Sequence, residues 1–208
     1  LDATMSNYKF TPVDVEKLKT EFASPNQQVP PVNLKVKRLA GLREMRARNS
    51  VTYGSKASNQ GEILFAKVPG IIVPDGFSIP FYWYDKFMTE NGLNDKIRGL
   101  MDDNDFVHNP RTRKAKLEQF REAIQNAPFD KALRAEVIAR WHTQLGSRPV
   151  FVRSSSNAED LPNFSGAGLY SSVPNVREAD KLIEAIKKVW ASLWKFEAYE
   201  ARVRNYVS

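Results

Sequence analysis

The sequence has 208 residues, enough for one domain or two small lobes. Its 31 Lys and Arg against 24 Asp and Glu give a formal net charge of +7, and 42% hydrophobic residues exclude a wholly disordered chain. With no cysteine and two histidines, disulfide scaffolds, thiolate metal sites, cysteine nucleophiles and histidine-rich metal clusters are excluded.

Targeting signals are missing from the sequence. No apolar run approaches the roughly 18 residues that a membrane helix needs, and residues 1–30 lack a charged start followed by an apolar stretch. We therefore expect a cytoplasmic protein without a membrane partner. The chain starts Leu1-Asp2-Ala3 and stops at Val207-Ser208 directly after a helical pattern, so we expect a piece of a longer protein.

The first third of the chain favours helices. Residues 1–34 are interpreted as an arm with one short helix, in which Val15, Leu18 and Phe22 share a face before prolines interrupt it. Residues 34–48 predict a basic helix, and residues 49–56 a loop. A further helix is expected over residues 57–67, with Ile63 and Leu64 facing inward, ended by Pro69-Gly70.

The middle of the chain mixes strands and helices. Residues 71–79 predict a strand interrupted by a turn, and residues 81–91 an aromatic helix closed by Gly92. Helices are then expected over residues 111–125 and 130–145. In the second of these, the apolar residues recur every four positions, at Leu133, Val137, Trp141 and Leu145.

The last third gives two strands and the clearest helix. Residues 149–154 predict a buried strand, and residues 168–173 a second strand. A single apolar stripe then predicts a helix, with Leu182, Ile183, Ile186, Val189, Trp190, Leu193 and Trp194 as its members. Helices with a few strands between them favour a mixed α/β lobe over a bundle or a sandwich.

The positive charge gathers in two clusters. The first contains Lys35, Lys37, Arg38, Arg43, Arg46 and Arg48, and the second Arg111, Arg113, Lys114 and Lys116. Neither is interleaved with aromatic residues, and neither lies in a zinc-finger or basic-zipper frame, so we expect no nucleic-acid partner. The simplest interpretation is two solvated helix faces, and a milder one is attraction of an anionic ligand such as a nucleotide.

Residues 53–58 form the first candidate site. The sequence Tyr-Gly-Ser-Lys-Ala-Ser predicts a loop that opens a helix, whose free N–H groups and dipole suit a phosphate, with Lys56 adding a point charge. The Walker A frame is absent. By itself the motif favours an ordinary loop with a solvated lysine over a phosphate site.

Residues 152–170 form a richer candidate. Arg153 lies where an apolar strand should end and can aim a planar fork of donors at a phosphate. The Ser165–Gly168 loop can bring backbone N–H groups close to a phosphate chain. A structural alternative stays open, because Ser156 and Glu159 form a capping box that would start a short helix, and Arg153 could pair with Glu159 or Asp160.

Metal and nucleophile sites are weakly supported. Glu159 and Asp160 fit a capping role better than a metal role. His108 follows the acidic residues 102–105, which we interpret as a polar surface loop, and His142 beside Trp141 is interpreted as structural. The sequence therefore predicts no metal ligands and no Ser/His/Asp triad.

Four segments, in order, resemble the N-terminal ATP-binding domain of the pyruvate phosphate dikinase and phosphoenolpyruvate synthase family. They are residues 54–59 (Gly-Ser-Lys-Ala-Ser-Asn), 68–77, 153–176 and 189–194 (Val-Trp-Ala-Ser-Leu-Trp). The resemblance covers residues 51–208 and leaves out residues 1–48. It implies a domain over residues 49–208, preceded by a helical arm.

The resemblance implies the first, helix-rich lobe of an ATP-grasp fold, of α/β class. ATP would lie between this lobe and a second lobe, where the Mg²⁺ ligands of the family lie. The residues implied to contact or cover the ATP phosphates are Lys56, Arg153, Ser165, Gly166, Ala167, Gly168 and Ser172. No catalytic residue is implied in this lobe.

Family members phosphorylate a histidine on a separate carrier domain, which then phosphorylates pyruvate or, in plant-type relatives, a glucan. Neither His108 nor His142 lies in the Thr-Ser-His context of that carrier. The Ala-Gly-Leu-Tyr sequence at residues 167–170 is closer to the α-glucan, water dikinases. We therefore expect the ATP-binding part of a dikinase-type phosphotransferase, inactive by itself. The alternatives are a glucan-type enzyme and a non-catalytic module that binds a partner through its basic face.

Overall fold

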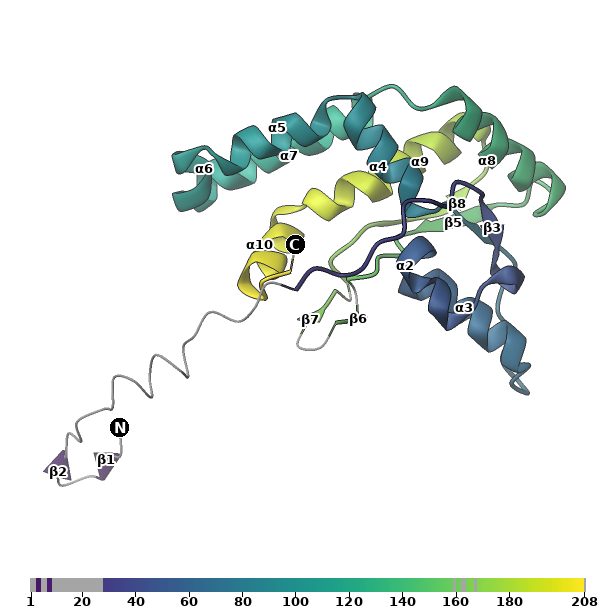
Figure 1. The fold of residues 1–208 in the computed structure, drawn as a ribbon, viewed down its shortest axis with the longest axis horizontal. Helices are drawn as coiled ribbons and strands as arrows, with labels where there is room; N and C mark the ends of the chain where they lie inside the picture. Colours follow the sequence, from purple (N-terminus) through teal and green to yellow (C-terminus); the bar gives the residue numbers. More distant parts are fainter. Residues whose placement is uncertain are drawn as a thin grey trace.

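The computed structural model describes residues 3–4, 7–8, 28–158, 160–161, 164–166 and 168–207. Within them the chain is mostly helical, with small two-stranded sheets (Figure 1). The helices of four or more residues are α2 (Ser50–Tyr53), α3 (Ser55–Ala66), α4 (Phe81–Glu90), α5 (Leu93–Met101), α6 (Asn104–His108), α7 (Pro110–Asn126), α8 (Lys131–Thr143), α9 (Ala179–Ala191) and α10 (Phe196–Arg204).

Every described sheet is an antiparallel pair. The pairs are β1 (Ala3–Thr4) with β2 (Asn7–Tyr8), β3 (Ala40–Gly41) with β4 (Phe77–Ser78), β5 (Val150–Arg153) with β8 (Ser172–Val176), and β6 (Asp160–Leu161) with β7 (Phe164–Ser165). Three short 3-10 helices complete the structure: η1 (Leu42–Glu44), η2 (Ala47–Asn49) and η3 (Ser192–Trp194). In the described part of the chain, no helix is both long and apolar enough to cross a bilayer.

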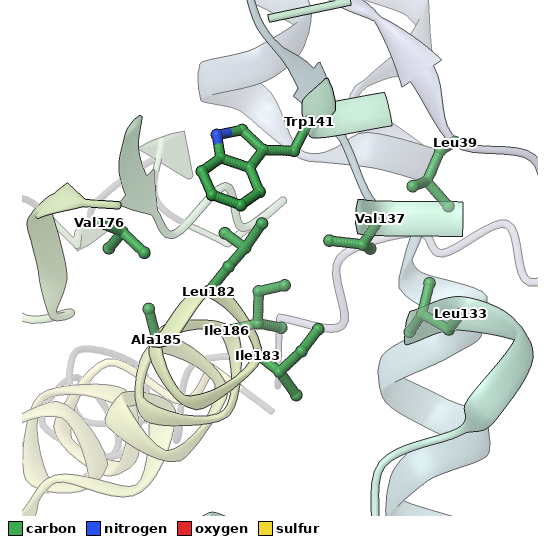
Figure 2. Close-up of a cluster of buried hydrophobic side chains, with 9 residues drawn as sticks. All are labelled: Leu39, Leu133, Val137, Trp141, Val176, Leu182, Ile183, Ala185 and Ile186. Atoms are coloured by element: carbon green, nitrogen blue, oxygen red, sulfur yellow. The ribbon is translucent and has the colours of Figure 1, made fainter. Parts of the chain in front are cut away.

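The main core lies where α8 and α9 meet the β5–β8 sheet. Its buried members are Leu39, Leu133, Val137, Trp141, Val176, Leu182, Ile183, Ala185 and Ile186. Figure 2 shows the side chains of α8 and α9 pointing toward one another across this cluster. The two predicted helices are therefore confirmed, because Leu133, Val137 and Trp141 on α8 and Leu182, Ile183 and Ile186 on α9 face this core. The last two residues of the second stripe, Leu193 and Trp194, lie in the 3-10 helix η3 rather than in α9.

A second cluster joins α4, α5 and α7 to the end of α9. Phe87, Leu93, Phe120 and Ile124 are buried there with Ala191. Trp190 packs against both clusters, and its ring stacks on Phe129 with 5.5 Å between ring centroids. The helices expected over residues 81–91 and 111–125 are thus confirmed within a residue at each end.

The predicted basic helix over residues 34–48 is wrong. Over these residues the structure has no α-helix, and its regular elements are the strand β3 and the short 3-10 helices η1 and η2. The carbonyls of Lys37 and Arg38, which a helix would use internally, accept hydrogen bonds from the Trp83 indole N–H at 2.7 Å and the Tyr53 hydroxyl at 2.8 Å. Tertiary hydrogen bonds and burial of Leu39 at 0% exposure override the local helix propensity.

Local side-chain bonds stabilise this irregular course. The Glu44 carboxylate accepts the Gly41 N–H at 2.8 Å and pairs with Arg38 at 2.6 Å. These two contacts, the first above all, hold the pKa of Glu44 below its ordinary value. The carboxylate is therefore charged at neutral pH and caps the start of η1.

Four other expectations need correction. Ile63 on α3 faces outward at 37% exposure, whereas Leu64 packs against the cluster of Ala40, Met45 and Tyr53. Of residues 71–79 only Phe77–Ser78 is a strand, and Ile72 is 92% exposed. The strand expected over residues 168–173 lies instead at Ser172–Val176.

The fourth correction concerns β5, which was expected to be buried on both faces. Val150 and Val152 are half-buried against the main core, but Phe151 and Arg153 are exposed. The side chains of a strand alternate between its faces, and the described structure covers only one face of this sheet. The expected helix around Val15, Leu18 and Phe22 lies outside the described residues.

Polar side chains cap the start of α6, which the sequence did not predict, and the start of α7. The Asp103 carboxylate accepts the N–H groups of Asp105 and Phe106, which starts α6, and Lys116 pairs with the same carboxylate. The Asn109 side chain then starts α7, with Pro110 at its first position. The acidic stretch over residues 102–105 is therefore a helix start rather than a loop. Helices α5 and α10 were also not predicted.

The buried position of Leu39 yields a stability prediction. Leu39→Ala should lower the free energy of unfolding by about 2–5 kcal/mol, because it leaves a cavity among Leu133, Val137 and Trp141. Leu34→Ala is the matched control, since Leu34 is 39% exposed, and should change it by less than about 0.5 kcal/mol. Denaturant titration measures both, and a loss for Leu39→Ala as small as that of the control would show that Leu39 does not belong to the core.

Candidate functional site

The two candidate site segments meet in the folded chain. The Ser55 N–H at the start of α3 donates to the Ser156 carbonyl at 3.0 Å, and the Ala57 N–H donates to the Ser155 hydroxyl at 3.0 Å. The sequence indicates the first segment as the start of a helix that suits a phosphate, and the second as the end of a strand that carries Arg153. The fold places them in direct contact although about a hundred positions separate them in the sequence.

Gly54 makes this close approach possible. A Cβ atom at position 54 would lie 1.9 Å from the Ser155 carbonyl oxygen and 2.5 Å from its hydroxyl. The residue also has φ of 83°, a conformation that side chains disfavour. Gly54 therefore serves both the turn into α3 and the packing of two backbones, a role that the sequence alone did not reveal.

The contact corrects one expectation about α3. Its N-terminus was expected to offer free N–H groups to a phosphate, but those of Ser55 and Ala57 already donate to residues 156 and 155. The protein itself thus uses two of the four N–H groups that a helix start leaves over. An anion bound at this point would therefore be recognised mainly by side chains, and Lys56 lies between the two bonded positions.

Arg153 lies at the end of β5 and faces away from the core. Its guanidinium carbon is 5.9 Å from the centroid of the Phe151 ring on the same face of the strand. Ser172 on β8 is its direct cross-strand partner, so these two predicted site residues lie side by side. Valines 150 and 152 fill the opposite face, and α9 therefore fixes the direction in which Arg153 projects.

The Ser165–Gly168 segment follows the β6–β7 hairpin. Ser165 pairs with Asp160 in that hairpin, and Gly166 is buried with its carbonyl accepting the Leu169 N–H at 3.2 Å. Gly168 is exposed, has φ of 77°, and has open space where a Cβ would be. Its backbone is thus accessible to a ligand, whereas Ala167 lies outside the described residues.

The capping alternative for Ser156 is wrong in part. The Ser156 hydroxyl accepts the Ala158 N–H at 3.0 Å, a local turn, and the chain continues into the strand β6 rather than into a helix. Of the two suggested partners of Arg153, Glu159 lies outside the described residues and only the backbone of Asp160 is described. Among the described carboxylates none pairs with Arg153.

Several side chains of the two basic clusters contact other parts of the molecule. Arg38 pairs with Glu44, and the Arg46 guanidinium lies 3.8 Å from the centroid of the Phe65 ring. In the second cluster, Arg113 pairs with Glu200 at 2.6 Å and is only 12% exposed. These three side chains make structural contacts. The expected solvated helix face holds for Arg111 and Lys114, which are exposed on α7, but not for the first cluster, which lies on no α-helix.

The histidines and acids form no metal site within the described residues, where no group of three such side chains converges. His142 stacks on Trp141, and its Nδ1 lies 2.6 Å from the Ser147 hydroxyl. That contact supports the structural interpretation of His142.

The Gly54 contact yields a prediction with a matched control. Gly54→Ala should lower the free energy of unfolding by more than about 3 kcal/mol, because strain at positive φ adds to a collision with the Ser155 backbone. Gly92→Ala should cost only about 1–2 kcal/mol, since Gly92 also has positive φ but open space around it. Equal losses in denaturant titration would refute the close approach.

Comparison with known proteins identifies the domain to which both segments belong. The family model described as "Pyruvate phosphate dikinase, AMP/ATP-binding domain" matches residues 51–208, which contain both contacting segments.

Curated relatives extend the likeness. A probable phosphoenolpyruvate synthase of Methanothermobacter thermautotrophicus is 29% identical over 82% of this chain and 25% of its own length. The phosphoenolpyruvate synthase of Helicobacter pylori is 34% identical over 77% of this chain and 20% of its own length. That of Escherichia coli is 32% identical over 73% of this chain and 20% of its own length. The chain thus spans a quarter or less of the length of each of these relatives.

The matched domain covers both candidate segments and most of the sequence. The chain therefore belongs to the pyruvate phosphate dikinase and phosphoenolpyruvate synthase family, as part of its ATP-binding domain.

Proposed function

We propose that this chain binds ATP as the first, helix-rich lobe of an ATP-grasp domain in a phosphoenolpyruvate synthase-like dikinase. In this proposal residues 49–208 form the nucleotide-binding unit. Residues 28–48 pack against it through Leu39 and Met45. The parent enzyme would pass phosphate from ATP to a carrier histidine outside this chain and then to pyruvate.

One observation carries the proposal: the start of α3, with Lys56, is hydrogen-bonded to the segment that directly follows Arg153. Lys56 and Arg153 therefore lie on two backbone segments that are hydrogen-bonded to each other. Phosphoryl transfer depends on positioning and on neutralising phosphate charge, which lysine and arginine supply in complementary ways. Lysine provides a compact charge, and arginine provides a planar fork that fits a phosphate.

The remaining residues of the proposed site complete a phosphate-binding surface. Ser172 lies beside Arg153 on the neighbouring strand and offers a hydroxyl. The accessible backbone at Gly168, a few residues earlier in the chain, suits a loop that closes over phosphates together with Ser165, Gly166 and Ala167. None of these groups is proposed to form a covalent intermediate.

ATP in such enzymes is handled with Mg²⁺, which neutralises phosphate charge when bound. The described residues provide no cluster of acidic or histidine side chains that fits this ion. The function proposed for this chain is therefore limited to holding the nucleotide through its cationic and backbone groups.

The relatives described above favour pyruvate as the final acceptor, because they are named as phosphoenolpyruvate synthases or probable ones. The alternative of a partner-binding module with a basic face is less favoured, because the matched family model describes an AMP/ATP-binding domain. Arg38, Arg46 and Arg113 from the two basic clusters are engaged in ion pairs, a ring contact and backbone hydrogen bonds.

Calorimetric titration of the 208-residue chain with ATP, with and without Mg²⁺, tests the proposal. Lys56→Ala and Arg153→Ala should each weaken ATP binding by about tenfold or more, since each removes a charge-assisted contact to phosphate.

Two control variants keep the charge change but move it away from the site. Lys67→Ala lies at the opposite end of α3, and Arg148→Ala lies just before the other end of β5. Both residues are exposed. Each control should leave the dissociation constant within about twofold of the unsubstituted chain. Equal losses in controls and site variants, or no loss in the site variants, would contradict the proposed phosphate site.

A further inference from the structure

Ser155 occupies the junction between the two halves of the proposed site. Its hydroxyl accepts the Ala57 N–H at 3.0 Å, although the two residues are 98 positions apart. Its carbonyl group lies so close to Gly54 that no side chain fits between them. Ser155 thus contacts α3 on both sides of Lys56, through its hydroxyl at Ala57 and through its backbone at Gly54.

Lys56 is flanked by two hydrogen bonds to the same short segment. The Ser55 N–H donates to the Ser156 carbonyl, and the Ala57 N–H donates to the Ser155 hydroxyl. The first bond uses only backbone atoms and is insensitive to side-chain changes. The second requires a hydroxyl at position 155, so that side chain alone can be altered to release one of the two restraints.

Arg153 is connected to this restraint through the chain itself. Only Ser154 separates Arg153 from Ser155, and Arg153 is fixed in the β5–β8 sheet opposite Ser172. A rigid link at Ser155 therefore sets where Lys56 lies relative to Arg153. A ligand that uses both cations needs that relation fixed before it binds, because ordering the loop on binding would cost affinity.

We propose that Ser155 is a positioning residue, which sets the place of Lys56 relative to Arg153 by accepting the Ala57 N–H, without itself contacting phosphate. This rests on the proposed function, in which both cations bind the phosphates of ATP. Nothing in the resemblance assigned a role to this serine.

The neighbouring serine is the matched control. The Ser156 hydroxyl accepts the N–H of Ala158 within its own turn rather than an N–H of α3. Ser156→Ala leaves the Ser156 carbonyl and its bond from Ser55 in place. Each variant removes a hydroxyl group from one of two adjacent serines, and only Ser155→Ala removes a hydrogen bond to α3.

The experiment measures ATP affinity by calorimetry for the unsubstituted chain, Ser155→Ala, Ser155→Thr, Ser156→Ala, Lys56→Ala and the double variant Ser155→Ala/Lys56→Ala. Ser155→Ala should weaken binding about fivefold, the factor that one neutral hydrogen bond contributes. Ser155→Thr, which keeps the hydroxyl, and Ser156→Ala should stay within about twofold. Far-ultraviolet circular dichroism and a denaturation midpoint establish that each variant is folded.

The double variant separates positioning from general destabilisation. If Ser155 acts through Lys56, adding Ser155→Ala to Lys56→Ala should weaken ATP binding by less than about twofold, because no lysine remains to be positioned. Additive losses would overturn the inference, and so would unchanged affinity in Ser155→Ala. This comparison stands even if the threonine variant does not fold.

Failure of the proposed function looks different. In that case the unsubstituted chain does not bind ATP, or Lys56→Ala and Arg153→Ala leave its affinity unchanged. Either result overturns the inference too, since there is then no phosphate site to position. Loss of binding in Lys56→Ala together with full affinity in Ser155→Ala overturns the inference and leaves the proposed function standing.

Discussion

The packing of α9 beneath the β5–β8 sheet is the interaction on which the rest of the structure depends. An isolated pair of strands is marginally stable in water, so this sheet needs an apolar partner on one face. Leu182, Ile183 and Ile186 supply it by covering the half-buried side of β5. Trp190 then connects the same helix to the second core, where α4, α5 and α7 meet (Figure 1).

The proposed site is a consequence of this arrangement. With one face of β5 held against α9, Arg153 and Ser172 project together from the other face. The chain after Arg153 then runs along the start of α3, where the absence of a side chain at Gly54 lets two backbones touch. The position of Arg153 in the proposed phosphate site thus depends on core packing, because one face of β5 packs on the core and the other face carries the arginine.

Elements that a local pattern specifies could be predicted from the sequence, whereas elements that depend on contacts between distant residues could not. The helices around Val137 and Ile186 were predicted well, since one long apolar stripe specifies each of them. The segment around Leu39 was not, because its buried residues face two different clusters and its carbonyls bond to Trp83 and Tyr53. For the site, the sequence pointed to Lys56 and Arg153, but Ser155 carried no signal that distinguished it from the serines on either side.

The sequence by itself determined the family and the main helices of this protein. Both follow from local patterns, namely four ordered motifs, a helical period of apolar residues, and the residue types that bind phosphate. Only the tertiary structure decided which backbone N–H groups are already used, which face of β5 is open, and which serine joins the two motifs. Those features depend on contacts between residues about a hundred positions apart, and no local pattern encodes the partner of such a contact.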